Sequence, residues 1–333
     1  MKNIAVVGCG HWGKNLVRNF HELGCLHSIC DPDKTTVKKF SSTFKVPNLS
    51  FDEMLDQSSV KGIVLAVPAP LHASFAIKAM KANKNVFVEK PIAMNLNEAQ
   101  NMITAAKANN VELMVGHLLQ YHPVFKEIKK YVTEKKLGSI RYIYSNRLSL
   151  GKIRSEEDVL WSFAPHDMSM ILSLLNAEPI SVNMQSKSII QENIADIATV
   201  YMDFETGTKA HVSVSWLNPY KEQKLVIVGE KMSLVFDDTQ SWNQKLASYK
   251  HKINFDKNKP KTIKENLNYI SIPEAEPLKE ECKHFIDLIN GDASPITDGE
   301  EGIRVLRVLT AATKSQEKNC SIYINDGKLS SKI

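Results

Sequence analysis

A glycine-rich turn between a strand and a helix constrains the fold of this chain more than any other feature. Residues 8–13, Gly-Cys-Gly-His-Trp-Gly, follow the apolar run 4–7 and precede a segment whose apolar residues recur at helical spacing. Gly8 permits the sharp bend, Gly10 lets the backbone approach a pyrophosphate, and Gly13 lets the helix pack on the strand. The turn therefore predicts a dinucleotide site, and we include His11 and Trp12 in it.

Strand-like and helix-like segments alternate up to about residue 120. Four further apolar runs of strand length occupy residues 26–30, 62–67, 85–88 and 111–115, with helix-like segments between them. Strands joined through helices run parallel, so this order predicts a doubly wound parallel sheet. We expect residues 1–120 to form an NAD-binding Rossmann domain, with ligands at the carboxyl ends of the strands.

Polar side chains follow several of these strands. Asp31 ends the second strand, where a carboxylate holds the ribose 2′-hydroxyl and repels a 2′-phosphate, so NAD is favoured over NADP. Val67 and Pro68 follow the third strand, and the prolines there stiffen a loop beside the cofactor. His72 starts the next helix and is expected near the nicotinamide ribose. Past the fifth strand, either Gln120 or His117 could face the nicotinamide or the sugar, and Gln120 is the residue that we assign to the cofactor site.

Glu89-Lys90-Pro91 follows the fourth strand, at the same ligand-binding edge. Pro91 favours an extended conformation for Lys90. A lysine in a partly apolar cleft can have its pKa lowered enough to exchange protons. We therefore expect Glu89 and Lys90 to contact the cofactor, and Lys90 to be catalytic.

The pattern changes after about residue 120. Longer strand-like runs with few helices predict a large, mostly antiparallel sheet, and the turn 205–208 predicts a hairpin. The expected fold class is thus α/β, a Rossmann domain followed by a second domain over residues 121–333. We assign substrate binding and oligomerisation to this second domain.

One helix of the second domain, over residues 165–175, carries a candidate base. Pro165 suits a first helical turn, so His166 would lie where the helix dipole favours neutral imidazole. A neutral histidine can accept the proton of an alcohol. Asp167 either caps this helix or holds His166, and capping is the preferred interpretation.

Basic residues surround Gly151. Arg147, Lys152 and Arg154, with Asn146 beside them, surround this glycine, and the three basic residues would supply cations for a diphosphate or carboxylate if the segment lines the cleft. The alternative is a solvated strand end.

Composition excludes several classes of protein. The 333 residues carry a net charge of +5 without a dense basic block, which argues against nucleic-acid binding. Five cysteines without a Cys-x-x-Cys pair argue against a disulfide framework or structural zinc, and His117 and His122 lack a carboxylate cluster, so no metal is expected. No signal peptide and no apolar run of about 18 residues is present, so we expect a cytoplasmic protein without membrane contact.

Together these motifs resemble the Gfo/Idh/MocA oxidoreductases over nearly the whole chain. The resemblance rests on the glycine turn, Glu89-Lys90-Pro91, the helix with His166 and the final segment 295–312. It implies a Rossmann domain, a C-terminal α/β domain with an open sheet, and a final helix, about 296–316, that returns to the Rossmann domain. It also implies that Lys90 and His166 are catalytic, and that the protein is a homodimer or homotetramer.

One position departs from the family pattern. Many members carry an aspartate four residues before the histidine, where this chain has Ser162. Proton transfer would then rely on Lys90 and His166, with Ser162 or Tyr121 as a hydrogen-bonding helper. The segment 144–167, which includes Arg147 and Trp161, resembles the sugar-nucleotide branch of the family, which contains UDP-N-acetylglucosamine 3-dehydrogenases.

The resemblance implies NAD-dependent oxidation of a secondary hydroxyl, at C3 of a nucleotide-linked sugar, in surface polysaccharide or lipid A sugar synthesis. His166 is ranked ahead of Lys90 as the base. Open alternatives are a free sugar, inositol or dihydrodiol as substrate, a reductase using NADPH, and a non-catalytic NAD(H) sensor. The expected substrate contacts are Tyr121, Arg147, Arg154, Trp161, Ser162 and His166.

Overall fold

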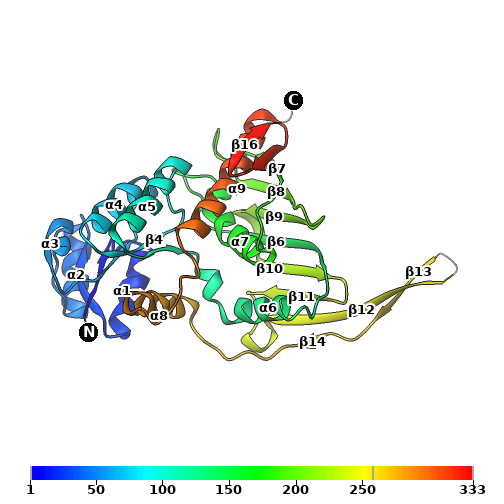
Figure 1. Cartoon of the computed structure of the whole chain (residues 1–333), viewed down its shortest axis with the longest axis horizontal. Coiled ribbons are helices and arrows are strands. Elements are labelled where there is room, and N and C mark those ends of the chain that lie inside the picture. The colour runs from blue at the N-terminus through cyan, green and yellow to red at the C-terminus, as the bar shows by residue number, and fades with distance from the viewer. Residues whose placement is uncertain (1, 257–258, 332–333) are drawn as a thin grey trace. The chain divides into compact units, whose positions relative to one another are not determined.

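The computed structural model describes residues 2–256 and 259–331. The chain forms two compact units: unit 1 comprises Met1–Tyr121 and Ala275–Leu306, and unit 2 comprises His122–Glu274 and Arg307–Ile333. Figure 1 shows the elements in chain order. Within the described ranges, every helix is too short or too polar to cross a membrane.

Unit 1 contains a five-stranded parallel sheet in the order β2-β1-β3-β4-β5, which confirms the predicted doubly wound fold. The residues of β1, β3 and β5 are all buried, as expected for strands covered on both faces. The strands are β1 (Ile4–Val7), β2 (Leu26–Cys30), β3 (Gly62–Leu65), β4 (Asn85–Glu89) and β5 (Leu113–Gly116).

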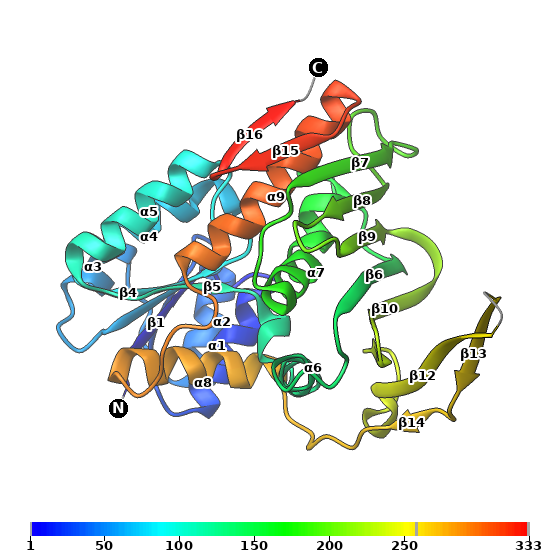
Figure 2. The same ribbon diagram turned by 45° about the vertical axis from the view of Figure 1, so that its right-hand side comes forward.

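Helices cover both faces of this sheet. Figure 2 shows α4 and α5 on one face and α1 and α8 on the other. Asn95 caps α5, because its side chain accepts a hydrogen bond from the backbone N–H of Glu98. The helices are α1 (Gly13–Glu22), α2 (Lys34–Phe44), α3 (Phe51–Asp56), η1 (Ala69–Leu71), α4 (His72–Lys81), α5 (Leu96–Asn109), η2 (Leu118–Tyr121) and α8 (Pro277–Asn290).

Helix α8 belongs to unit 1, although it follows the long second domain in sequence. Its Phe285 packs edge-on against Phe20 of α1 and Phe87 of β4, with ring centroids 6.4 and 5.7 Å apart. From the sequence we predicted a second domain over residues 121–333, from which only the final helix, about 296–316, would pack back on the Rossmann domain. In the structure, residues 275–306 join unit 1, and α9 (Gly299–Lys318) begins in unit 1 and ends in unit 2.

Unit 2 contains an eleven-stranded sheet that is antiparallel except where β6 pairs with β9. The predicted hairpin at 205–208 is confirmed: β8 and β9 pair antiparallel, and Gly207 has a left-handed φ of 80°. The strands are β6 (Ile140–Leu150), β7 (Ser181–Lys187), β8 (Ile197–Asp203), β9 (Lys209–Ser215), β10 (Leu217–Gly229), β11 (Met232–Asp237), β12 (Leu246–Asp256), β13 (Lys259–Lys264), β14 (Asn268–Tyr269), β15 (Ile322–Asn325) and β16 (Lys328–Ser331).

The helices of this unit that precede α9 are α6 (Pro123–Thr133), α7 (Val159–Leu175) and the short η3 (Trp242–Gln244). Helix α7 packs on β6, β8 and β9, where Ala198, Val200 and Met202 are buried. Alternate residues of the same strands point the other way, so the opposite face of the sheet carries a cluster of aromatic rings: Tyr142, Tyr144, Tyr201 and His211.

Candidate functional site

The three glycines of the turn after β1 have different surroundings. Gly8 has a φ of 93°, and a Cβ there would lie 2.4 Å from the carbonyl oxygen of Ala66. A Cβ on Gly13 would lie 1.9 Å from the oxygen of Gly8, whereas a Cβ on Gly10 would meet nothing within 4 Å. Packing therefore requires glycine at 8 and 13. Position 10 borders open space, which is what close approach of a phosphate needs.

Asp31 lies at the edge of this turn, directly after β2. Its Oδ2 accepts a hydrogen bond from the backbone N–H of Cys9 at 2.6 Å, and its Oδ1 accepts one from Asp33 at 2.9 Å. A carboxylate can accept further bonds, so Asp31 can still receive those of a ribose. The open space at Gly10 and this carboxylate together fit a dinucleotide.

His72 joins the loops that follow β3 and β4. It is 1% exposed, with Nδ1 2.8 Å from the oxygen of Pro91 and Nε2 2.9 Å from the oxygen of Val67. Burial lowers the pKa of His72, although the two carbonyls oppose that shift. The ring thus supports these loops, including the exposed Pro68. Its expected contact with the ribose stays a prediction.

Glu89 links the glycine turn to the end of β4. Its Oε1 accepts a hydrogen bond from Nε1 of Trp12 at 2.5 Å, and its Oε2 lies 3.3 Å from the backbone nitrogen of Lys90. A Cβ on Gly116, the β5 neighbour of Glu89, would lie 2.9 Å from Oε2, so glycine makes room for the carboxyl group. Burial raises the pKa of Glu89 to about 7, opposed by Trp12, Lys90 and His117.

The structure therefore brings together residues predicted from two separate motifs: Trp12 of the glycine turn, and Glu89 with Lys90 after β4. Lys90 is half-buried and precedes a cis proline. The predicted His11 is exposed in the same turn.

Gln120 and Tyr121 are buried in unit 1, with 2% and 0% exposure. The Tyr121 hydroxyl lies 2.9 Å from Oγ1 of Thr297, and its ring centroid is 5.3 Å from that of His284. Burial raises the pKa of Tyr121 well above its ordinary value. Tyr121 thus packs within unit 1, and its expected contact with the substrate stays a prediction.

The helix that carries His166 begins earlier than the sequence indicated. Asp158 caps α7 by accepting a hydrogen bond from the backbone N–H of Trp161 at 3.0 Å, so Pro165 lies inside the helix. The predicted start at Pro165 is therefore wrong. His166 is half-buried and lies beyond the first turn, where the helix dipole has little effect.

Asp167 does not cap α7, which corrects the preferred interpretation. It is 1% exposed and forms a bidentate pair with Arg147 of β6, with distances of 2.6 and 3.2 Å, while its Oδ1 also accepts from Ser145 at 2.5 Å. Arg147 thus forms a buried ion pair with Asp167, and its expected contact with the substrate stays a prediction. The pair fixes α7, and with it His166, on the sheet.

The other predicted substrate contacts also lie in unit 2. Arg154 pairs with Glu157 at 3.2 Å, and Nε1 of Trp161 donates to Oγ1 of Thr313 at 3.3 Å. Ser162 is 5% exposed. Their contacts with a substrate stay predictions.

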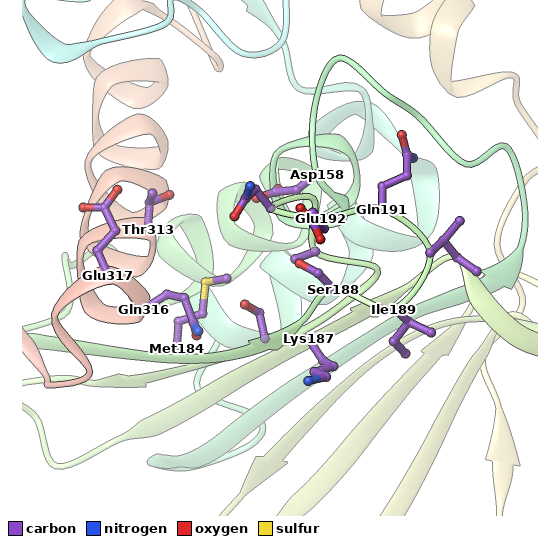
Figure 3. Close-up of a pocket in the computed structure, with 14 residues that line it drawn as sticks. Asp158, Met184, Lys187, Ser188, Ile189, Gln191, Glu192, Thr313, Gln316 and Glu317 are labelled. Atoms are coloured by element: carbon purple, nitrogen blue, oxygen red, sulfur yellow. The ribbon is translucent and has the colours of Figure 1, made fainter.

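A cavity of about 760 Å³ opens in unit 2 between the β7–β8 loop, the start of α7 and the last turns of α9. Figure 3 shows Asp158, Glu192 and Glu317 around it, against one cation, Lys187. This excess of carboxylates does not suit a diphosphate. None of the predicted substrate residues lines the cavity, so we do not assign it to the substrate.

Comparisons with known proteins match both units. Residues 2–117 match the model of the Gfo/Idh/MocA oxidoreductase family with an NAD-binding Rossmann fold. Residues 125–235 match the model of the C-terminal domain of the same family.

Several relatives are similar to this chain. UDP-N-acetylglucosamine 3-dehydrogenase of Acidithiobacillus ferrooxidans is 27% identical over 63% of this chain and 66% of its own. Its solved structure matches with a TM-score of 0.83 over 95% and 98% of the two chains, at 23% identity. The WlbA dehydrogenase from Bordetella pertussis, solved with NADH and UDP-GlcNAcA, matches with a TM-score of 0.78 over 97% and 98%, at 21% identity.

A relative with a different substrate is also similar. The scyllo-inositol 2-dehydrogenase (NAD⁺) of Bacillus subtilis is 23% identical over 96% of both chains. The structural likenesses establish the fold that these proteins share.

Proposed function

Because this chain belongs to the Gfo/Idh/MocA family of NAD-dependent oxidoreductases, we propose that it oxidises a secondary hydroxyl of a nucleotide-linked sugar. The proposed position is C3 of a sugar such as UDP-N-acetylglucosamine, in the synthesis of surface polysaccharide or lipid A. The main support is similarity over almost the whole fold to two enzymes. One is named for a UDP-sugar substrate, and the other was solved with a UDP-sugar bound.

In this proposal, residues of the glycine turn and Asp31 would hold NAD, and the bound cofactor would supply the acceptor for the hydride of the sugar carbon. A ring nitrogen of His166 accepts the hydroxyl proton, and Nζ of Lys90 donates a hydrogen bond to the oxygen as negative charge develops on it. The supporting observations are local. Lys90 is half-buried beside Glu89, and α7 presents His166 from a helix that the pair Arg147–Asp167 fixes.

Ser162 replaces the aspartate that many relatives carry. Asp167 does not compensate, because its carboxylate pairs with Arg147 and accepts from Ser145. The proposed chemistry therefore relies on Lys90 and His166.

The test is an assay of NADH absorbance with NAD and three substrates: UDP-N-acetylglucosamine, free N-acetylglucosamine and scyllo-inositol. The proposal expects turnover with the UDP-sugar and little with the others. Turnover only with scyllo-inositol would replace it by the second candidate, an inositol dehydrogenase, which the full-length similarity to the Bacillus subtilis enzyme favours. Absence of turnover with all three would contradict both.

We also propose that the protein assembles as a homodimer or homotetramer through the outer face of the unit 2 sheet. The half-exposed rings of Tyr142, Tyr144 and Tyr201 support this, because aromatic side chains are enriched in interfaces. Light scattering coupled to gel filtration tests it: Tyr201→Asp should shift the mass toward the monomer. An unchanged oligomer would exclude this face.

A further inference from the structure

One carboxyl group in unit 1 is buried without a partner. Glu281, on α8, is 0% exposed, and within residues 2–256 and 259–331 neither of its carboxyl oxygens has a hydrogen-bond partner. A carboxylate in such surroundings is strongly disfavoured, and the group keeps its proton instead. Burial, together with the charge of Glu89, raises the pKa of Glu281 well above its ordinary value.

Glu281 lies at the same end of the sheet as Glu89. Phe285, one helical turn after Glu281, packs on Phe87, two residues before Glu89. Further along α8, Ile289 reaches Gly62 at the start of β3, since a Cβ on Gly62 would lie 2.6 Å from its Cδ1. Helix α8 therefore runs from the carboxyl ends of the strands toward their amino ends, and its earlier residue Glu281 is on the side of Glu89.

The strand order places this pair on the nicotinamide side of the cofactor site. Asp31 after β2 suits the adenosine ribose, and the turn after β1 suits the pyrophosphate. In the order β2-β1-β3-β4-β5, β3 and β4 lie on the side of β1 opposite β2, so the remaining half of a bound dinucleotide would extend toward the end of β4, where Glu89 lies. The oxidised nicotinamide ring is a cation and the reduced ring is neutral, so a fixed anion favours the oxidised form.

We propose that half-buried Glu89 and buried Glu281 form a carboxyl pair in which Glu281 holds a proton and Glu89 carries the single negative charge, and that this charge makes the protein prefer oxidised over reduced NAD. Glu281 lets the pair carry one charge rather than two. The inference rests on NAD binding and is independent of the sugar. The titratable groups around the pair are Lys90, His117 with its partner Glu301, Tyr121, Cys282 and His284.

The preference should depend on pH, because the pKa of Glu89 is about 7. Below it, both carboxyl groups are protonated and the pair is neutral. Above it, Glu89 is ionised and the oxidised cofactor gains affinity relative to the reduced one.

The first test measures the dissociation constants of NAD⁺ and NADH by calorimetry, at about pH 5.5 and about pH 8.5, on either side of this pKa. The ratio Kd(NADH)/Kd(NAD⁺) should rise roughly tenfold with pH in the wild type, and Glu89→Gln should abolish the rise. Glu300→Gln, which removes an exposed carboxylate of the same unit, should keep it. A ratio independent of pH, or a rise that survives in Glu89→Gln, would overturn the proposal.

The second test examines Glu281 without cofactor. Infrared difference spectra at about pH 8, where an ordinary glutamate is ionised, should show the carbonyl stretch of a protonated carboxylic acid in the wild type and in Glu89→Gln. Glu281→Gln should lack that band yet keep the wild-type Kd ratio, because its amide is as neutral as the protonated acid. Absence of the band, or a changed ratio in Glu281→Gln, would refute the role of Glu281. Both tests stand even if no UDP-sugar is oxidised.

Discussion

The indole Nε1 of Trp12 donates a hydrogen bond to the carboxyl group of Glu89 and thereby joins two motifs that lie 77 residues apart in sequence. Trp12 belongs to the turn that suits the pyrophosphate, and Glu89 immediately precedes Lys90. The contact fixes the position of the expected catalytic lysine relative to the cofactor turn.

Lys90→Met should remove most turnover while NAD binding persists, because the methionine keeps the aliphatic stem but donates no hydrogen bond. We expect a loss of about 10² to 10⁴ in kcat. Lys81→Met, an exposed lysine at the end of α4, is the matched control. Near-normal turnover in Lys90→Met would disprove the catalytic assignment.

Asp31→Ala should relax the discrimination against NADP, because the carboxylate that would repel a 2′-phosphate is removed. Calorimetry with NAD and NADP measures the change. Asp33→Asn is a suitable control: it removes a nearby exposed charge, while an amide oxygen can still cap α2. Unchanged discrimination in Asp31→Ala would rule out its ribose contact.

Gly13→Ala and Gly10→Ala should affect different properties: the first should lower stability, and the second should weaken NAD binding. A Cβ on Gly13 would lie 1.9 Å from the oxygen of Gly8, so Gly13→Ala should lower the free energy of unfolding by roughly 1–3 kcal/mol or more. Gly10→Ala meets no atom and should change stability by about 0.5 kcal/mol or less, yet weaken NAD binding. Thermal unfolding and calorimetry distinguish them, and normal NAD affinity in Gly10→Ala would contradict the approach of a phosphate.

Arg147→Ala should be strongly destabilising, because Asp167 would remain buried without its cation. A loss of about 3–5 kcal/mol in the free energy of unfolding is typical for such a pair. The double variant Arg147→Met/Asp167→Leu should recover much of the loss. Urea denaturation measures all three proteins, and a double variant no more stable than Arg147→Ala would show that the pair has another role.

Glu281→Gln should make the protein more stable at alkaline pH. The folded-state pKa of Glu281 is raised above its ordinary value of 4.5. The contribution of Glu281 to the free energy of unfolding is therefore fully present below pH 4.5, and it is lost as the pH rises through the folded-state pKa. Over that window the variant should gain about 1.4 kcal/mol per pH unit relative to the wild type. Denaturation at several pH values checks this. Glu300→Gln should show no such gain, and a parallel course for Glu281→Gln and wild type would be inconsistent with the raised pKa.

The sequence predicted the elements whose signals are local. The parallel order of unit 1 followed from buried apolar runs between helices. The start of α7 was missed because Pro165 is a typical first-turn residue. The helix continues through Pro165 because tertiary contacts bury Leu160 and Ala164.

Contacts between distant residues gave no signal in a single sequence. Arg147 and Asp167 are 20 residues apart, and either one alone is a plausible surface charge. Glu281 looks like a solvent-facing position between Glu280 and Lys283, and only the packing of α8 on unit 1 buries it. Side-chain partners of this kind depend on the folded topology, not on local pattern.

The discontinuity of unit 1 has a consequence for protein engineering. A fragment that stops at residue 121 contains the whole parallel sheet and the glycine turn, but it lacks α8 and the ring of Phe285. Phe20 and Phe87 would then present apolar surface to water. Such a fragment should aggregate, and a soluble cofactor-binding module requires residues 275–306 to be joined to it.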